Sequence, residues 1–214
     1  MKVKNVFFLL VISAVFFSYS GQVQSQSKGE KNMKNIAEYT LHTKESAPKA
    51  SGEMLGKAEQ QFGFVPNILR QMAEAPSAFQ GDLQLLDAFE KSSLTLAERW
   101  VILLVVSGQC EANYCVAANS TIAKMLGVSA DIVESVRKGE SLPDAKLEAL
   151  RIFTDEMVRN RGMASRETQE RFFEAGFTKE NVFDVILGIA LETMASYTAR
   201  ITGTPMDEQF KENE

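Results

Sequence analysis

The sequence contains few of the residues that usually carry metal or cofactor chemistry. Its 214 residues include two cysteines, one histidine and one tryptophan. These residues do not gather with carboxylates at the spacing of metal ligands, so we expect no metal site. A glycine-rich loop of the kind that cradles phosphates is also missing, and we expect no cofactor.

Clusters of basic residues are missing as well. The chain carries 23 lysines and arginines against 28 aspartates and glutamates, which gives a formal net charge of −5. Binding to nucleic acid or to an anionic membrane surface normally requires a basic patch. The composition therefore argues against both kinds of partner.

The longest apolar run lies near the N-terminus, within residues 1–25. Lys2 and Lys4 precede Val6–Phe17, which is almost wholly apolar, and residues 23–25 form a plausible cleavage site. These features are typical of a secretory signal peptide. The run is shorter than the ~20 residues that a membrane-spanning helix needs, so a permanent anchor is the weaker alternative. We expect export, to the periplasm or beyond, with no membrane attachment after cleavage.

The rest of the chain divides into a leader and one domain. Residues 26–50 are polar and of low hydrophobicity, which is typical of a flexible leader. The only histidine, His42, lies in this segment, and we expect it to be solvated. Residues 51–210 are long enough to bury a sizeable core and are expected to form a single domain.

Apolar residues in this domain recur at intervals of three and four, which is the period of a helix. Residues 100–106 are apolar on all sides, so the helix that contains them should be the most deeply buried. No segment has the length and flanks of a strand. The fold class is predicted to be all-α, with helices expected at residues 53–62, 68–75, 76 onward, 95–107, 113–127, 129–138, 144–161, 165–175 and 179–202.

Individual residues mark several helix ends. Asn67 should cap the second helix, and Thr95 with Glu98 has the spacing of a capping box. Gly203 should end the last helix. Gly188, inside that helix, costs ~1 kcal/mol relative to alanine, which suggests a close contact with another helix. The inner stripe of the last helix is expected to be Val182, Val185, Ile186, Ile189 and Met194.

Both cysteines lie in one short segment, from Cys110 to Cys115. Gly108 should end one helix and another should start near Asn113, so Cys115 lies at a helix start, where the helix dipole favours a thiolate. In a continuous helix, residues five apart are separated by ~7.5 Å along the axis, beyond disulfide reach. A bend before Tyr114 would let the two sulfur atoms meet. A redox-active disulfide, a structural disulfide and two independent buried thiols all remain open, although export favours oxidation.

Several segments have a familiar pattern: YCVAANSTIAK at residues 114–124, GFVPN at 63–67, LPD at 142–144 with LEAL at 147–150, and GTPMD at 203–207. Together they resemble the carboxymuconolactone decarboxylase and AhpD-like alkylhydroperoxidase family. The resemblance covers nearly all of the predicted domain and implies an all-helical AhpD-like fold. It also implies a homo-oligomer, a trimer or hexamer that associates through long apolar helices.

The chain departs from the redox motif of the family that it resembles. Redox members have two cysteines separated by two residues, a histidine four residues after the second cysteine, and an acidic residue fifteen before it. Cys115 matches the second cysteine, but the other three positions hold Ala112, Asn119 and Trp100. Cys110 would therefore supply the second thiol from a displaced position.

Acid–base chemistry near the thiols would have to use other residues. Glu98 and Glu111 are the nearest carboxylates, but Glu98 is better explained as a helix-start residue and Glu111 as an exposed one. Asn119 can orient a water or a thiolate but cannot take a proton near neutral pH. Tyr114 could contribute a hydroxyl, although packing is the commoner role, and Trp100 is expected in the core or at a subunit interface.

The predicted function is that of an exported thiol oxidoreductase with weak or specialised peroxidase activity. Cys115 would attack or resolve, Cys110 would be its partner, peroxide would be the substrate and a thiol protein the reductant. One alternative is a non-catalytic AhpD-fold oligomer that binds a small ligand or a partner protein, with Trp100 filling the site. A lactone decarboxylase, the other activity of the family, would need an acid–base side chain, and the predicted domain contains no histidine.

Overall fold

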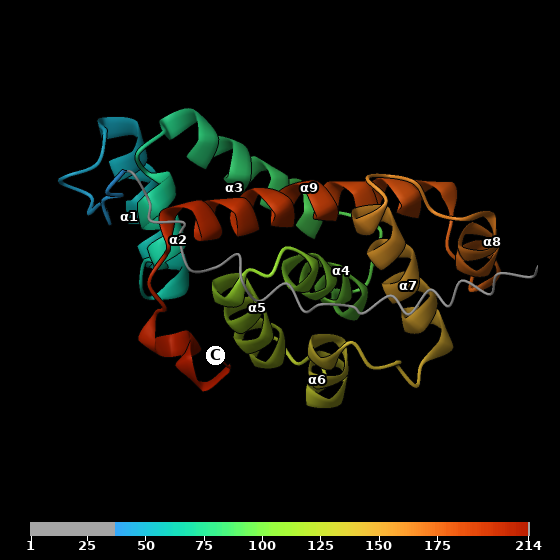
Figure 1. Ribbon diagram of the computed structural model, residues 1–214. Helices are drawn as coiled ribbons and strands as arrows, with labels where there is room; N and C mark the ends of the chain where they lie inside the picture. The colour runs from blue at the N-terminus through green and yellow to red at the C-terminus, as the bar shows by residue number, and fades with distance from the viewer. Residues whose placement is uncertain (1–36, 214) are drawn as a thin grey trace, which may run out of the picture. The chain divides into compact units, whose positions relative to one another are not determined.

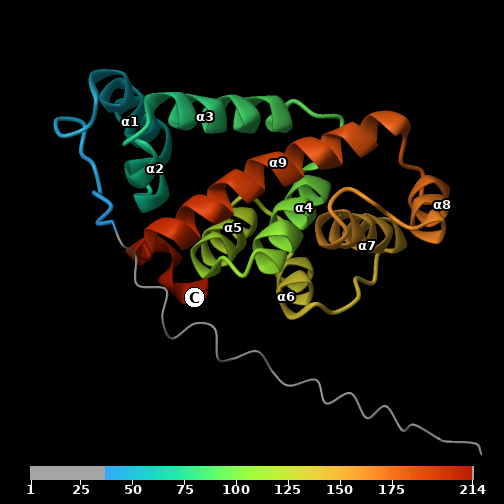
Figure 2. The same cartoon turned by 45° about the horizontal axis from the view of Figure 1, so that its top comes forward.

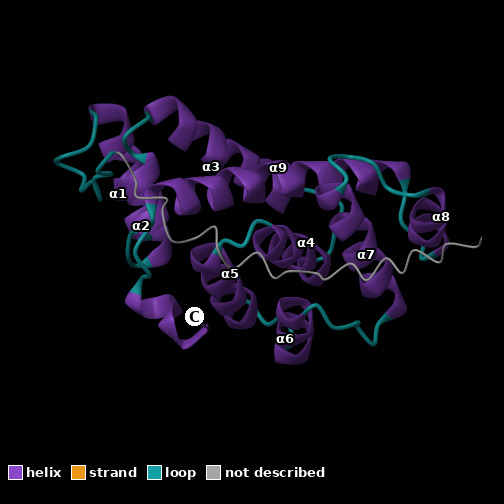
Figure 3. Cartoon of the chain, in the orientation of Figure 1, coloured by secondary structure: helices purple, strands orange, loops and turns teal. Residues whose placement is uncertain are grey.

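The computed structural model describes residues 37–213, and every regular element within that range is a helix (Figures 1 and 3). The all-α fold class is therefore confirmed. The predicted signal peptide and the first part of the predicted leader lie outside the described residues. The elements are α1 (Lys49–Phe62), α2 (Asn67–Met72), α3 (Pro76–Glu90), α4 (Leu96–Gln109), α5 (Asn113–Met125), α6 (Ala130–Lys138), α7 (Ala145–Arg159), α8 (Arg166–Glu174), α9 (Lys179–Thr202) and the short 3₁₀-helix η2 (Glu208–Asn213).

Two of the predicted helix ends follow local capping chemistry, and one does not. Thr95 Oγ1 accepts a hydrogen bond from the amide of Glu98, and the Glu98 carboxylate accepts one from the amide of Thr95, so the predicted capping box starts α4. Gly203 ends α9 at a φ of 60°, in the left-handed region that favours glycine. The prediction for Asn67 is wrong. Pro66 occupies the cap position of α2, and the side-chain amide of Asn67 instead donates to the backbone carbonyl of Pro205, just after α9.

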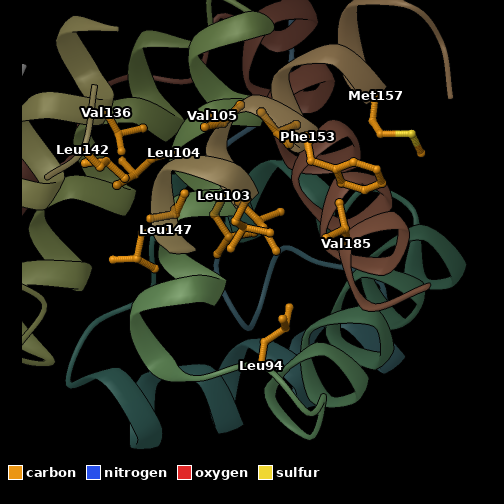
Figure 4. Packing of buried hydrophobic residues seen from close by; sticks show 14 of the residues in the cluster. Leu94, Leu103, Leu104, Val105, Val136, Leu142, Leu147, Phe153, Met157 and Val185 are labelled. Carbon is orange, nitrogen blue, oxygen red and sulfur yellow. The ribbon is translucent and has the colours of Figure 1, made fainter. Parts of the chain in front are cut away.

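The core is centred on α4, whose residues from Val101 to Ser107 are all buried. Side chains from α6, α7 and α9 meet it there, as Val136, Leu147 and Val185 illustrate (Figure 4). The predicted burial of this helix is confirmed. Its end fixes the position of Cys110, which follows its last residue.

The long helix α9 runs between α3 on one side and α4 and α5 on the other (Figure 2). The predicted close contact at Gly188 is confirmed, because a Cβ atom built there would lie 2.7 Å from the Phe89 ring and 2.8 Å from Ile102 Cγ2. Glycine therefore lets α9 approach α3 and α4 closely enough for its polar side chains to reach α5.

The faces of α9 differ from the predicted inner stripe. Ile186 is 43% exposed, so its assignment to the inner stripe is wrong. The face that is buried instead consists of Val185, Gly188, Leu191, Glu192, Ser196 and Ala199. An apolar stripe on the opposite face is exposed and contains Phe183, Ile186, Tyr197 and Ile201. By length and composition α9 could also cross a membrane, a property that core helices of soluble proteins share.

His42 is not solvated as predicted, because it is 9% exposed and held against α2. Its Nε2 donates to Glu74 at 2.8 Å, and its backbone exchanges hydrogen bonds with Arg70, whose guanidinium also donates to the carbonyl of Leu41. The prediction failed because a polar segment can be ordered by hydrogen bonds to an existing helix without burying many apolar side chains. The described part of the leader thus includes an ordered segment.

Candidate functional site

The chain reverses direction between α4 and α5, as the sequence predicts. Cys110 follows the last residue of α4, Glu111 adopts a φ of 51°, and α5 begins at Asn113. The guanidinium of Arg200, on α9, donates to the backbone carbonyls of Cys110 and Glu111. This bend brings the two cysteines to the same side of the chain, and Arg200 holds it in place.

Both cysteines are free thiols, and both pack in an apolar cluster to which α9 contributes Ala195 and Ala199. Cys115 is 4% exposed, whereas Cys110 is half-buried. The Glu192 carboxylate and the Ser196 hydroxyl act on the pKa of each thiol, and Cys110 packs against the apolar cluster that contains Cys115. The two thiols therefore share one polar site.

Glu192 is a buried carboxylate at the centre of this site. It is 4% exposed, and its Oε1 accepts a hydrogen bond of 3.0 Å from Ser196 Oγ. The pKa of Glu192 is raised from 4.5 to about 7, chiefly by burial and to a smaller extent by the charge of the nearby Asp82, while Asn119, Ser196 and the Cys115 thiol act in the opposite direction. A carboxyl group with this pKa exchanges a proton readily near neutral pH.

A second buried carboxylate, Asp82 of α3, lies near Glu192. It is 6% exposed, and its Oδ1 has no hydrogen-bond partner. Burial raises the pKa of Asp82 to about 6. The two carboxylates repel each other when both are ionised, so each makes the other easier to protonate.

The thiols themselves are not acidic, which corrects the expectation of a thiolate at the start of α5. Burial, and after it the charge of Glu192, raise the pKa of Cys115 well above its usual range. The same two causes raise the pKa of Cys110, against which Ser196 and Arg200 act weakly. Desolvation next to a carboxylate therefore outweighs the helix dipole, and both groups are thiols at neutral pH.

Among the predicted supporting residues, Asn119 faces Glu192, whereas Glu98 and Glu111 form ion pairs with other residues. Asn119 is buried and close enough to Glu192 to lower its pKa, although its Nδ2 makes no hydrogen bond of normal geometry. Glu98 caps α4 and pairs with Lys146 at 2.8 Å, as expected of a helix-start residue. Glu111 is exposed and pairs with Arg200.

Tyr114 has a packing role. Its hydroxyl donates to Asp207 Oδ2 at 2.6 Å and accepts a hydrogen bond from the amide of Ile68 at 3.3 Å. Its ring packs edge-on against Phe210 in a small apolar cluster that also contains Cys115. Tyr114 thus joins α2, α5 and the segment after α9, and its hydroxyl is committed to those contacts.

Trp100 does not fill the site. It is half-buried and packs against the core around α4, whereas Cys115 belongs to the cluster with Tyr114. An open cleft of about 500 Å³ lies elsewhere, between α1 and α3, and none of the site residues lines it. Among residues 37–213 no group of three or more histidine, cysteine, aspartate and glutamate side chains is arranged to hold a metal ion.

Sequence reasoning missed Glu192, Ser196 and Asp82. A signal for the first two was present: Glu192 and Ser196 occur four residues apart, in the same helical register as Val185 and Gly188. A carboxylate on the buried stripe of a helix is costly and therefore often functional. Asp82 stands on a helix that is only partly buried, so nothing in the sequence marks it.

Comparison with known proteins shows the fold. No protein-family model and no curated protein sequence matches the chain. Among solved structures, an uncharacterized peroxidase-related protein with an alkylhydroperoxidase AhpD core, from Ralstonia eutropha JMP134, is similar with a TM-score of 0.73 and 21% identity, covering 83% of this chain and 95% of that one. An uncharacterized peroxidase-related protein from Silicibacter sp. TM1040 has a TM-score of 0.70 at 17% identity, covering 86% and 97%.

The debrominase Bmp8, in a cysteine-to-alanine variant with 2,3,4-tribromopyrrole, has a TM-score of 0.69 at 16% identity, covering 85% of this chain and 96% of that one. The chain therefore has the AhpD-like helical fold that its sequence resembles. These similar proteins include both peroxidase-related proteins and a debrominase, so the fold alone does not determine the reaction.

Proposed function

We propose that this protein is an exported thiol oxidoreductase with weak or specialised peroxidase activity, in which Cys115 and Cys110 cycle between two thiols and one disulfide. The observation that carries the proposal is the convergence of both thiols on Glu192 and Ser196 across the bend between α4 and α5. The AhpD-like fold, similar to that of peroxidase-related proteins, supports it. Export would place the pair where disulfides persist.

The contact of Cys115 with Glu192 and the greater exposure of Cys110 indicate different roles for the two thiols. Cys115, which contacts the Glu192 carboxylate, attacks the peroxide, so that an S–O bond forms, the O–O bond breaks and an alcohol or water leaves. The thiol of Cys110 then attacks the sulfenic sulfur, an S–S bond forms, and water leaves. Cys110 is the more exposed sulfur, so an external dithiol attacks it and Cys115 is the leaving thiolate.

Peroxide added to the reduced mature protein is expected to consume both thiols and to produce an intramolecular disulfide. Alkylation followed by mass spectrometry would detect this as the loss of two hydrogens and of both alkylation sites. The variant Cys110→Ser should stop at a sulfenic acid that dimedone traps, because no second thiol resolves it. The variant Cys115→Ser should leave Cys110 alkylatable. If both thiols of the unmodified protein survive peroxide, the oxidoreductase proposal is wrong.

We also propose that the exposed apolar stripe of α9 binds a second copy of this chain, as the resemblance implies. The stripe contains Phe183 and Tyr197, which are 72% and 63% exposed, and it extends along the whole 24-residue helix. Exposed apolar surface of this extent on a soluble protein usually marks an interface. A self-complementary helix face can be covered by an identical helix from another copy.

The variant Tyr197→Glu is expected to lower the molar mass measured by light scattering to that of a smaller assembly, because it places a charge in the apolar contact. Met163→Glu is the matched control, since Met163 is 71% exposed but lies outside α9. An unmodified protein that is already monomeric, or equal masses for the two variants, would contradict this interface.

A further inference from the structure

Thiol chemistry at this site requires a proton acceptor. The thiolate is the nucleophile, yet burial keeps Cys115 protonated at neutral pH. The positions that hold acid–base residues in the redox motif are Asn119 and Trp100 here, and neither side chain can take a proton. His42 is committed to Glu74, which lies just after α2.

Glu192 is the carboxylate within reach of the thiols. It contacts Cys115 and its charge acts on Cys110, while Ser196 holds one of its oxygens at 3.0 Å. Its position on the long helix α9, in the same buried stripe as Gly188, fixes it relative to α5. The side chain is thus held against the reacting sulfur without depending on a mobile loop.

We propose that Glu192 is the catalytic acid–base residue of this site, supplied by α9 in place of the residues that α4 and α5 lack. This inference rests on the proposed function. The ionised carboxylate accepts the proton of Cys115, and the resulting thiolate attacks the peroxide. As the O–O bond breaks, the protonated carboxyl group returns the proton to the leaving oxygen, so the products are a sulfenic acid and an alcohol or water.

The same carboxyl group serves the two later steps. It accepts the proton of Cys110 when that thiol attacks the sulfenic acid, and it donates the proton to the hydroxide that leaves as water. During reduction it accepts the proton of the external dithiol that attacks Cys110, and it returns this proton to the Cys115 thiolate that is displaced. In each step Glu192 begins and ends in the same protonation state, so one residue can complete the cycle.

The polar groups that face Glu192 come from four elements. They are Asp82 of α3, Cys110 at the end of α4, Cys115 and Asn119 of α5, and Ser196 of α9 itself. Asp82 does not touch the thiols and acts through Glu192, so it is a positioning residue. Its negative charge makes Glu192 a stronger base, and removal of that charge should shift the pH dependence of the reaction toward lower pH.

The test is the rate of disulfide formation, measured by quenching with acid and alkylating, between pH 5 and pH 9. For the unmodified protein the rate should rise with pH and level off near pH 7, as Glu192 ionises. Glu192→Gln should lower the rate at pH 7 by ~10²-fold or more and should remove the inflection. Glu192→Asp, which keeps a carboxylate one methylene shorter, should recover part of the rate.

Two variants complete the design. Asp82→Asn should keep the inflection but move it to lower pH, which a purely structural role of Asp82 would not do. Glu180→Gln is the matched control, because Glu180 is an exposed residue of the same helix and should leave the rate and its pH dependence unchanged. Circular dichroism of every variant shows whether the helices are retained.

The outcomes separate the two proposals. If the unmodified protein forms the disulfide and Glu192→Gln forms it equally fast, Glu192 has no catalytic role and the oxidoreductase proposal stands. If the unmodified protein forms no disulfide, the oxidoreductase proposal is wrong and the role of Glu192 is wrong with it.

Discussion

The free energy of unfolding of the reduced protein is expected to decrease by roughly 3 kcal/mol or more between pH 5 and pH 8. Burial raises the pKa of Glu192 from 4.5 to about 7 and that of Asp82 from 3.8 to about 6. The folded state therefore binds these two protons more tightly than the unfolded chain does. The stability that the protons contribute is present at low pH and is lost as the pH rises through the folded-state values.

The expected size follows from the same values. Raising the pKa of Glu192 from 4.5 to about 7 means that ionisation of this group destabilises the folded state by roughly 3 kcal/mol. Ionisation of Asp82 destabilises it by a similar amount. The two costs do not add fully, because the carboxylates interact. Glu98 and Glu148 have lowered pKa values and act in the opposite sense, but their stabilisation is lost only below their ordinary value of 4.5.

Urea unfolding at several pH values, with a reductant present, measures this effect. Glu192→Gln should be about as stable as the unmodified protein at pH 5, where the protonated carboxyl group resembles the amide, and ~2 kcal/mol more stable at pH 8. The matched control Glu180→Gln should follow the unmodified protein at both pH values. A stability that is flat or rises from pH 5 to pH 8 would show that these carboxylates are solvated.

Gly188→Ala is expected to lower the free energy of unfolding by about 2 kcal/mol. The added Cβ would lie 2.7 Å from the ring of Phe89 and 2.8 Å from Ile102 Cγ2. Both neighbours are 1% exposed or less, so neither can move aside without displacing others. The clash outweighs the ~1 kcal/mol that alanine normally gains over glycine within a helix.

Gly81→Ala provides the matched control. Gly81 also lies within a helix, but a Cβ there would meet nothing within 4 Å. This variant should gain ~0.5–1 kcal/mol from helix propensity alone. Urea midpoints at constant m-value compare the two variants directly. Equal stabilities would mean that α9 does not approach α3 and α4 as closely as the fold requires.

The sequence predicted those features that depend on neighbouring residues. The capping box of Thr95 and Glu98, the end of α9 at Gly203 and the bend between Cys110 and Tyr114 all arise from local backbone chemistry. The sequence pattern also indicated the AhpD-like fold, because several separate segments carry the resemblance.

The sequence did not predict the groups that complete the site. Glu192 is far from Cys115 along the chain, and the two meet only because α9 packs across α5. The burial of Asp82 depends in the same way on how α3 lies against α9. Helix α9 is apolar on both its buried and its exposed face. The spacing of its apolar residues therefore does not show which face is buried, and the prediction places Ile186 on the wrong one.

The dependence of the thiol pair on α9 determines when the pair becomes protected. During synthesis the cysteine segment emerges before Glu192, Ser196 and Arg200, which lie nearer the C-terminal end of the chain. Until those residues arrive, both thiols behave as ordinary accessible cysteines and can pair with foreign thiols. A chain that ends before α9 would therefore have two accessible thiols and would form mixed disulfides with other proteins. It would not be a folded protein of lower activity.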